Sequence, residues 1–313
     1  MKPLLRYLYK MGVHWKIQVA LILVLCLLPL SGPAAGDDQS SLPARHWNQS
    51  NLSRIKAHNP DSLTFAVFGD SRDNEAVFGQ LLKQVDQDPD FAFAIHVGDV
   101  VPDGELGNFR SFIKQVKQCL RLPLLTVIGN HDIQNRGRDY YLVIFGQYYY
   151  SFHLNNNYFI MVDNAGITSL TEKQLRWLAE ELQKSQSFRR RFVFLHVPLF
   201  DPRQDTAPHA LAPEYGRRLA DLFKKYKVTH IFTGHIHGYF TGKWSGVPYT
   251  ITAGGGARLH GDDPQHFFFH FLKVTIDGEH VRIQAQRVLE PRSPGPGPQP
   301  AKGSQIKDPH PIK

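Results

Sequence analysis

Five short polar motifs, each directly after an apolar run, constrain the fold of this chain more than any other feature. They are Gly69-Asp70, Gly98-Asp99, Gly129-Asn130-His131-Asp132, His196 before Val197-Pro198, and Gly234-His235-Ile236-His237. The apolar runs are rich in Phe, Val and Ile and alternate with helical patterns, as a layered α/β domain requires. In open α/β sheets ligands bind outside the carboxyl ends of the strands, so we expect the motifs to converge there.

The apolar patterns give a specific order of elements. Strands are predicted at 63–68, 91–97, 123–128, 158–162, 192–196, 230–233, 249–251 and 269–276. Helices are predicted at 74–86, 107–117, 171–185 and 214–226. The third helix has the strongest start signal, because Thr171 precedes Gln174 in a capping-box arrangement.

The two ends of the chain differ in composition from the part between them. Residues 1–36 contain a basic stretch, an uncharged apolar stretch and a run of small residues, which predicts a signal peptide or an N-terminal membrane anchor. Either interpretation places the remainder outside the cytoplasm, periplasmic or extracellular. Residues 37–62 are predicted to be a linker, 63–288 the folded domain, and the Pro/Gly-rich 289–313 a disordered tail.

The net charge of +8 does not indicate a nucleic-acid-binding protein. Four basic residues lie in the first 36 positions with no acid among them, so about +4 remains without that segment. The one dense basic run left, at 189–191, is interpreted as a solvated helix end. We therefore expect no nucleic-acid partner, and membrane contact only through the N-terminal segment. The oligomeric state stays open.

Taken singly, each polar motif has an ordinary structural explanation. A Gly-Asp pair after a strand commonly forms a turn whose carboxylate caps the next helix, and a lone histidine such as His196 is commonly a hydrogen-bonded core residue. The presence of all five motifs in this order, at the same end of successive strands, instead indicates one shared site. Asp, Asn and His are ligands for divalent transition metals, so the set predicts a two-metal hydrolytic site.

The order of these motifs resembles that of the calcineurin-like metallophosphoesterase superfamily, over roughly 63–287. The segments 149–152, 158–163 and 174–178 are similar to its exported phosphatase and phosphodiesterase branches. The resemblance implies an α/β fold in the form of a four-layer αββα sandwich. It also implies two divalent ions, with Mn, Fe or Zn expected, and a phosphoester substrate, a monoester or diester, hydrolysed by a metal-bound hydroxide.

The resemblance assigns roles by motif. The implied metal ligands are Asp70, Asp99, Asn130, His196, His235 and His237. Asp99 would bridge the ions, with Asn130, His196 and His235 on one of them and Asp70 and His237 on the other. A bridging group is physically necessary, since two divalent ions about 3.5 to 4 Å apart repel by roughly 17–19 kcal/mol at an effective dielectric of 20. His131 would act as electrophile or general acid, and Asp132 would orient its imidazole.

Arg72 departs from the family pattern, which has Asp-x-His where this chain has Asp70-Ser71-Arg72. Arginine stays protonated and is no metal ligand. Asp73, Asn74 or water could fill the gap, or one ion could bind weakly, leaving a mononuclear enzyme. We favour a third possibility, in which Arg72 clamps a substrate phosphate and water completes the ion's ligands. A solvent-facing Arg72 stays open.

Two other functions stay open at this point. A nuclease or nucleotide phosphodiesterase would have a basic groove near Arg72 and strongly salt-dependent binding. A degenerate metallophosphoesterase fold could instead serve as a non-catalytic interaction module, which would bind no metal.

Overall fold

The first of two β-sheets is built around three parallel strands. The computed structural model describes residues 42–56, 62–166, 170–203 and 209–288. The strands of this sheet are β1 (Ser62–Phe68), β2 (Phe91–His96), β3 (Leu124–Thr126), β10 (His270–Asp277) and β11 (His280–Arg287), in the order β11-β10-β1-β2-β3. β1, β2 and β3 run parallel, and β10 and β11 extend the sheet as an antiparallel pair.

The second sheet has six strands, four of them parallel. Its strands are β4 (Tyr150–Leu154), β5 (Asn157–Met161), β6 (Arg190–Phe194), β7 (His230–Thr233), β8 (Tyr239–Trp244) and β9 (Val247–Thr252), in the order β4-β5-β6-β7-β9-β8. β5, β6, β7 and β9 are parallel, and β4 and β8 close the two edges in antiparallel hairpins. Both sheets therefore present a set of carboxyl strand ends.

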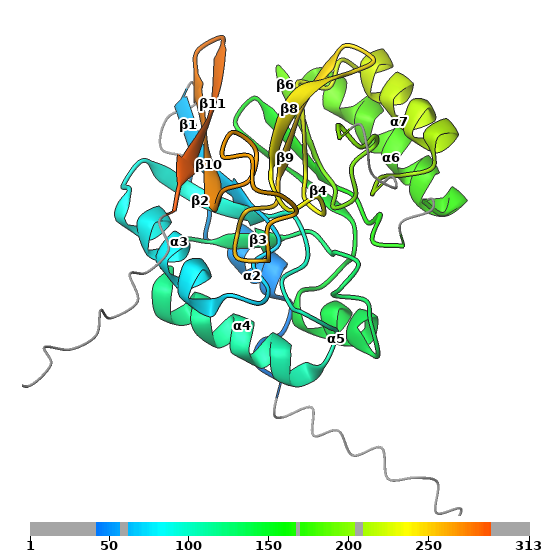
Figure 1. Ribbon diagram of the computed structural model, residues 1–313. Helices are drawn as coiled ribbons and strands as arrows, with labels where there is room; N and C mark the ends of the chain where they lie inside the picture. The colour runs from blue at the N-terminus through cyan, green and yellow to red at the C-terminus, as the bar shows by residue number, and fades with distance from the viewer. Residues whose placement is uncertain (1–41, 57–61, 167–169, 204–208, 289–313) are drawn as a thin grey trace, which may run out of the picture. The chain divides into compact units, whose positions relative to one another are not determined.

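Helices cover the outer faces of the sheets (Figure 1). They are α2 (Trp47–Leu52), α3 (Glu75–Gln87), α4 (Leu106–Cys119), α5 (Gly137–Ile144), α6 (Glu172–Lys184) and α7 (Pro213–Lys225), with a short 3₁₀ turn at Ser185–Ser187. Three apolar clusters separate the layers: α3, α4 and α5 against the first sheet, one sheet against the other, and α6 and α7 against the second sheet. The predicted four-layer αββα sandwich is confirmed.

Phenylalanines dominate the layer between the sheets. Phe65 of the first sheet meets Phe159 and Phe192 of the second edge-to-face, with ring centroids 5.6 and 5.8 Å apart. All three side chains are fully buried. Complete burial of such a side chain contributes roughly 1.5–3 kcal/mol, and edge-to-face pairs add to this. This contact fixes one sheet against the other, and with it the relative position of their strand ends.

The predicted helix start at Thr171 is confirmed. The Thr171 side chain accepts a hydrogen bond from the Gln174 amide at 3.2 Å, and α6 follows directly. Its apolar residues Leu175, Leu178 and Leu182 are buried on one face, against the second sheet. The capping residue and the apolar spacing thus specify both where the helix begins and which side it buries.

Part of the segment predicted as a linker is folded instead. The Trp47 indole donates to the Leu124 carbonyl at 2.8 Å, and Asn48 is buried. The Asn48 carboxamide accepts from the Thr126 amide at 2.9 Å and contacts the Thr126 hydroxyl. Because β3 is an edge strand, these polar contacts give its free side a partner. Helix α2 therefore belongs to the domain.

The interpretation of the basic run at 189–191 as a solvated helix end is wrong. Arg190 and Arg191 begin β6 and are buried. The Arg191 guanidinium donates to the Lys227 carbonyl at 3.0 Å and to the Phe188 carbonyl as well, while Arg190 donates to the Gly278 carbonyl. These arginines hold loops to the second sheet and form no basic surface.

Several predicted segments lie outside the described residues. These are the signal peptide or anchor at 1–36, the first part of the predicted linker at 37–41, and the tail at 289–313. Among the residues that the structure does describe, no helix combines the length and apolar character needed to cross a membrane.

Candidate metal centre

The predicted site residues follow the carboxyl ends of strands from both sheets. Asp70, Asp99 and Asn130 come after β1, β2 and β3, whereas His196 and His235 come after β6 and β7. The backbone turns sharply at three of these positions, because Asp70, Asp99 and His235 have φ values of 57°, 58° and 70°. Non-glycine residues rarely adopt this conformation, which costs of order 1–3 kcal/mol and is typical of functional sites.

One part of the centre, here called the asparagine half, consists of Asp99, Asn130, His196 and His235. The Asn130 Oδ1 atom lies 2.9 Å from His196 Nε2 and 2.8 Å from His235 Nδ1. His196 Nε2 lies 3.3 Å from Asp99 Oδ1. Neighbouring ligands of an ion held at about 2.1 Å are roughly 3.0–3.4 Å apart, so these four donors fit one divalent ion. Asp70, Asp99 and His196 also form a compact group of potential ligands.

His196 is held in the orientation that a metal ligand needs. Its Nδ1 atom donates to the Val97 carbonyl at 2.9 Å, which leaves Nε2 directed at Asn130 and Asp99. The backbone before it is fixed by Asn164, whose Oδ1 accepts from the His196 and Val197 amides at 2.9 and 3.0 Å. Such outer contacts fix the tautomer and the ring plane of metal-binding histidines. Asn164 has no motif around it that sequence reasoning recognised.

Glycine is required before Asp99 because the site is packed tightly there. A Cβ atom added to Gly98 would lie 2.5 Å from His196 Nδ1, and Gly98 has a φ of 96°. Gly129 is as constrained, since its added Cβ would meet the backbone and carboxylate of Asp99. These two glycines let Asp99, Asn130 and His196 approach one another.

The other part of the centre, here called the arginine half, consists of Asp70, Arg72 and His237. Asp70 Oδ1 lies 3.4 Å from His237 Nε2, and both Asp70 oxygens accept from the His235 amide, at 3.2 and 3.1 Å. The Arg72 guanidinium lies beside these groups, with Nη2 3.3 Å from His237 Nε2 and Nε 3.5 Å from Asp99 Oδ2. Arg72 is therefore inside the centre and not turned to solvent, with a side chain 16% exposed.

The prediction that Asp132 orients the His131 imidazole is wrong. Asp132 is fully buried, and its carboxylate accepts from the amides of Gly129 at 2.7 Å, Asp99 at 3.1 Å and Val101 at 3.2 Å. It therefore ties the turn after β3 to the turn after β2. Burial, followed by the nearby Asp99 carboxylate, raises the pKa of Asp132 to about 7. Asp132 positions the backbone that carries the ligands.

His131 takes its orientation from a backbone carbonyl. Its Nδ1 lies 2.6 Å from the Pro102 carbonyl oxygen, and its amide donates to Asp99 Oδ1 at 2.9 Å. This leaves Nε2 facing Asp99 Oδ2 at 4.0 Å, at the rim of the centre, with the side chain 25% exposed. His131 is thus close to the ligand set yet reachable by a substrate.

Charge in the centre is strongly polarised. Burial opposes ionisation of Asp99, but the His196 imidazole outweighs it and lowers the pKa of Asp99. For His196, burial lowers the pKa, but the Asp99 carboxylate outweighs burial and raises it to about 9. Burial and then the His196 charge lower the pKa of His235 to about 3, which keeps this imidazole neutral and available as a ligand.

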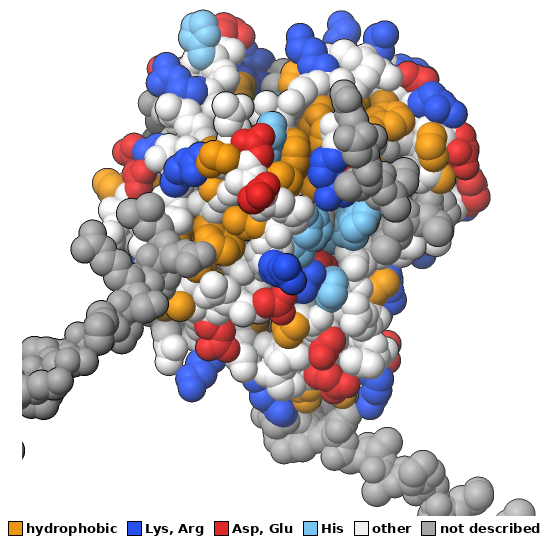
Figure 2. Space-filling model, viewed as in Figure 1, with side chains coloured by type: hydrophobic (Ala, Val, Ile, Leu, Met, Phe, Trp, Pro, Cys, Tyr) orange, Lys and Arg blue, Asp and Glu red, His pale blue; other side chains and the backbone are white. Residues whose placement is uncertain are grey.

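The residues of the centre fit a divalent ion. Asp99 Oδ1, Asn130 Oδ1 and one nitrogen each of His196 and His235 meet at 2.8–3.3 Å, while the buried Asp99 Oδ2 faces the Arg72 guanidinium at 3.5 Å. The donor set is oxygen and imidazole nitrogen without sulfur, which suits Mn, Fe or Zn. Figure 2 shows histidine side chains gathered beside both basic and acidic side chains in the middle of this face.

Two further histidines border the arginine half. The His260 ring stacks on His237 with centroids 4.0 Å apart, and its Nδ1 accepts from the His237 amide at 3.2 Å. His209 lies 5.8 Å from His260 and 6.0 Å from His235, between ring centroids. Neither histidine belongs to the five motifs, and His209 follows no strand. Neither position had a local signal.

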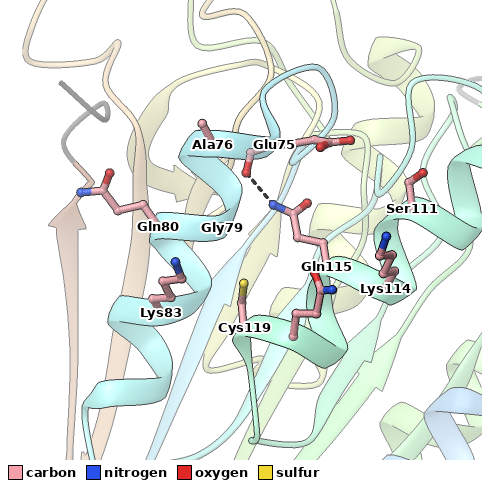
Figure 3. A pocket seen from close by; sticks show the side chains of 10 residues that line it. Glu75, Ala76, Gly79, Gln80, Lys83, Ser111, Lys114, Gln115 and Cys119 are labelled. Atoms are coloured by element: carbon pink, nitrogen blue, oxygen red, sulfur yellow. Dashed lines mark hydrogen bonds between the residues drawn. The ribbon is translucent and has the colours of Figure 1, made fainter. Parts of the chain in front are cut away.

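Two hollows differ in their relation to the centre. A groove of about 780 Å³ between α3 and α4, with Cys119 at one end, is lined by none of the predicted site residues (Figure 3). Its one drawn contact joins Gln115 Nε2 to the Glu75 carbonyl. A smaller pocket of about 190 Å³ is lined by Arg72 and by Pro102, the hydrogen-bond partner of His131. The smaller pocket adjoins the centre.

Known proteins share both the sequence pattern and the fold. A model of the calcineurin-like phosphoesterase family matches residues 63–239. The serine/threonine-protein phosphatase CPPED1 of Danio rerio is 31% identical over 249 residues, covering 71% of this chain and 77% of that protein. A probable cyclic nucleotide phosphodiesterase of Rhodopseudomonas palustris is 24% identical, covering 64% and 77%. The chain spans about half the length of the mammalian CPPED1 proteins it matches, for example 56% of the human protein.

Among solved structures, purple acid phosphatase PPD1 from yellow lupin (Lupinus luteus) seeds superposes with a TM-score of 0.54. The match covers 72% of this chain and 52% of that one, at 16% identity, and therefore supports the fold alone. The family match covers more than half of the chain and includes the strand ends that carry the centre. This protein belongs to the calcineurin-like phosphoesterase family, whose chemistry is the metal-dependent hydrolysis of phosphoesters.

Proposed function

We propose that this protein is an exported phosphatase that hydrolyses phosphate monoesters with a divalent metal ion. The observation that carries the proposal is the convergence of Asp99, Asn130, His196 and His235 within ligand distance of one another.

The residues around the ion prepare the site for a phosphoryl group. When bound, the ion activates water as a nucleophile and polarises the phosphoryl oxygens. Asn164 and the Val97 carbonyl fix His196. Asn130 and His235 place their donor atoms beside it. Arg72 adds a fixed positive charge beside them, which stabilises negative charge on a phosphoryl oxygen.

His131 is the group that we assign to the leaving alcohol. Its Nδ1 is held by Pro102, and its Nε2 faces the rim of the centre, on the side where Pro102 and Arg72 line the small pocket. From there Nε2 can donate a proton to the oxygen that leaves phosphorus. General acids of this kind contribute roughly 10²–10⁴-fold to rate.

Preference for a monoester follows from charge. A phosphomonoester carries one more negative charge than a diester, and the Arg72 guanidinium next to the ion-binding donors matches that charge. The relative with 31% identity bears the name of a serine/threonine-protein phosphatase, which agrees with a monoester substrate. The relative named as a probable cyclic nucleotide phosphodiesterase is less similar, at 24%.

A rate comparison tests the proposal. Full-length protein supplied with Mn²⁺, Fe²⁺ or Zn²⁺ should hydrolyse p-nitrophenyl phosphate faster than bis(p-nitrophenyl) phosphate, and chelation should stop both reactions. A faster diester reaction would overturn the monoester assignment alone. Protein that binds none of these ions and hydrolyses neither compound would be a non-catalytic interaction module, and the proposed function would be rejected.

Export is proposed from the first 36 residues of the sequence. The chain should accumulate outside the cytoplasm when it is produced with its own N-terminus. A mature protein that starts near residue 37 indicates a cleaved signal peptide, and a full-length protein in the membrane fraction indicates an anchor. Recovery of the intact chain from the cytoplasmic fraction alone would contradict export.

A further inference from the structure

Arg72 places a permanent cation among groups that would otherwise hold an ion. Its Nη2 lies 3.3 Å from His237 Nε2, and its Nε lies 3.5 Å from Asp99 Oδ2, the oxygen that faces away from His196. Arg72 Nε and Asp99 Oδ2 are both buried and lack other hydrogen-bond partners among the described residues. The guanidinium therefore stands between His237 and Asp99.

The guanidinium is fixed where it lies. Arg72 Nη1 donates to Asp73 Oδ2 at 2.7 Å, and the side chain forms part of the wall of the 190 Å³ pocket. Moving it away from Asp99 would break the Asp73 contact and leave the Asp99 oxygen alone in a buried place. Leaving such a charge unpaired is strongly unfavourable.

The neighbouring side chains do not replace the missing histidine. Asn74 caps α3, because its Oδ1 accepts from the Val77 amide at 3.1 Å. The Ser71 hydroxyl lies 2.9 Å from His96 Nε2, which is fully buried. Asp73 is engaged with Arg72 itself. Each nearby polar group thus has another partner, which leaves Asp70, His237 and the bridging Asp99 as the groups that could hold an ion in the arginine half.

Electrostatics opposes an ion in that half. A divalent ion about 4 Å from a guanidinium is repelled by roughly 8 kcal/mol at an effective dielectric of 20. The carboxylates of Asp70 and Asp99 would attract such an ion, but the Arg72 guanidinium already lies 3.5 Å from the Asp99 oxygen that would bridge to it. The asparagine half contains no permanent cation, since its donors are one carboxylate, one carboxamide and two imidazoles, which can give up a proton to bind an ion.

We propose that this centre holds one divalent ion, in the asparagine half, and that the Arg72 guanidinium takes the place of the second ion of a two-metal phosphoesterase. This inference rests on the proposed function. Asp70 then serves as a positioning residue, since both its oxygens accept from the His235 amide and its Oδ1 lies 3.4 Å from His237 Nε2. Arg72 supplies the second positive charge to the substrate phosphate, and this charge does not depend on the binding of a second ion.

Metal stoichiometry tests the inference without reference to activity. Full-length protein saturated with Mn²⁺ and freed of excess ion should contain one Mn per chain by elemental analysis. Its electron paramagnetic resonance spectrum should be the six-line signal of an isolated Mn²⁺ ion. Two Mn per chain, with the multiline signal of a coupled pair, would overturn the inference and leave the proposed function intact.

Substitution of Arg72 supplies the complementary test. Arg72→His restores the family pattern and should raise the content from one Mn to two. Arg72→Gln removes the charge but adds no imidazole, so its second ion should bind at least tenfold more weakly than that of Arg72→His. Arg282→His, at an exposed position on β11, controls for an added histidine and should keep one Mn.

The results distinguish failure of the one-ion inference from failure of the proposed phosphatase function. One Mn in the wild type and two in Arg72→His support the inference. One Mn in both proteins would overturn it, because Arg72 would then not be what excludes the second ion. Absence of bound metal from the wild type, together with no hydrolysis, would reject the proposed function itself. Circular dichroism of each variant ensures that a low metal content reflects a folded chain.

Discussion

The two halves of the centre differ in what already occupies the space between their donor atoms. In the asparagine half, Asn130 Oδ1 faces two imidazoles at 2.8 and 2.9 Å, and the groups that meet are all potential ligands. In the arginine half, a guanidinium nitrogen lies 3.3 Å from His237 Nε2, slightly nearer than Asp70 Oδ1 at 3.4 Å. The same strand ends thus build an ion site on one side and a fixed organic cation on the other.

This difference shows that one substitution can add a positive charge to a metal centre while the remaining ligands keep their positions. The ligands of the arginine half keep their places because Asp70 also accepts the His235 amide and His237 Nδ1 lies 2.6 Å from the Arg258 carbonyl. Their structural contacts do not depend on an ion. A histidine-to-arginine change there removes one ligand and adds a positive charge, while the backbone of the centre is preserved.

The strongest test of the comparison replaces one histidine in each half. His235→Ala should abolish ion binding and lower kcat/KM by about 10³-fold, which corresponds to roughly 4 kcal/mol of lost transition-state stabilisation. His237→Ala should keep one ion per chain and lower kcat/KM by about tenfold. Equal losses of metal and activity in both variants would show that the halves are equivalent. Elemental analysis and steady-state kinetics measure the two effects.

Asp132→Asn tests whether the two turns must be tied together. The substitution replaces one carboxylate oxygen, which accepts backbone amides, with a donor, so at least one of the amides of Gly129, Asp99 and Val101 loses its partner. Metal affinity should fall about 10–100-fold, as for other residues that support metal ligands. Asp139→Asn, at an exposed position in α5, is the matched control. Unchanged affinity, measured by isothermal titration, would exclude a positioning role for Asp132.

His260→Ala should have the smallest effect of the three. His260 stacks on His237 and accepts its amide, but it lies outside both halves. We expect kcat/KM to fall only about threefold and the ion content to stay at one per chain, because a single neutral hydrogen bond contributes roughly 0.5–1.5 kcal/mol. Loss of the ion in this variant would make His260 part of the ligand set and would require the boundary of the arginine half to be redrawn.

The layers of the fold were predictable because apolar residues recur along this chain with the clear periods of strands and helices. The capped helix at Thr171 and the parallel strands followed from apolar spacing. β11 was missed although Val281, Ile283 and Ala285 alternate with exposed residues, a period-two signal that the sequence carries. Helix α2 had no comparable signal, since its buried residues are Asn48 and Asn51 and their partners lie far along the chain.

The site was predictable to the level of strand ends but not of side-chain contacts. Motif order placed Asp99, Asn130 and His196 at one edge, where the structure brings them together. The role of Asp132 could not be read in the same way, because adjacency to His131 in sequence says nothing about which atoms a buried carboxylate meets. Its three amide partners come from two turns that only the folded sheet brings together.

The ligands of the asparagine half come from both sheets, since Asp99 and Asn130 follow β2 and β3 while His196 and His235 follow β6 and β7. An ion bound there adds a cross-link between two layers that already meet through apolar packing and through hydrogen bonds such as that of His196 with the Val97 carbonyl. At an ion concentration 100 times its dissociation constant, this linkage adds about 2.7 kcal/mol to the free energy of unfolding. Thermal stability therefore reports occupancy of the centre without any substrate, and the domain is most stable only where the surrounding solution supplies the metal.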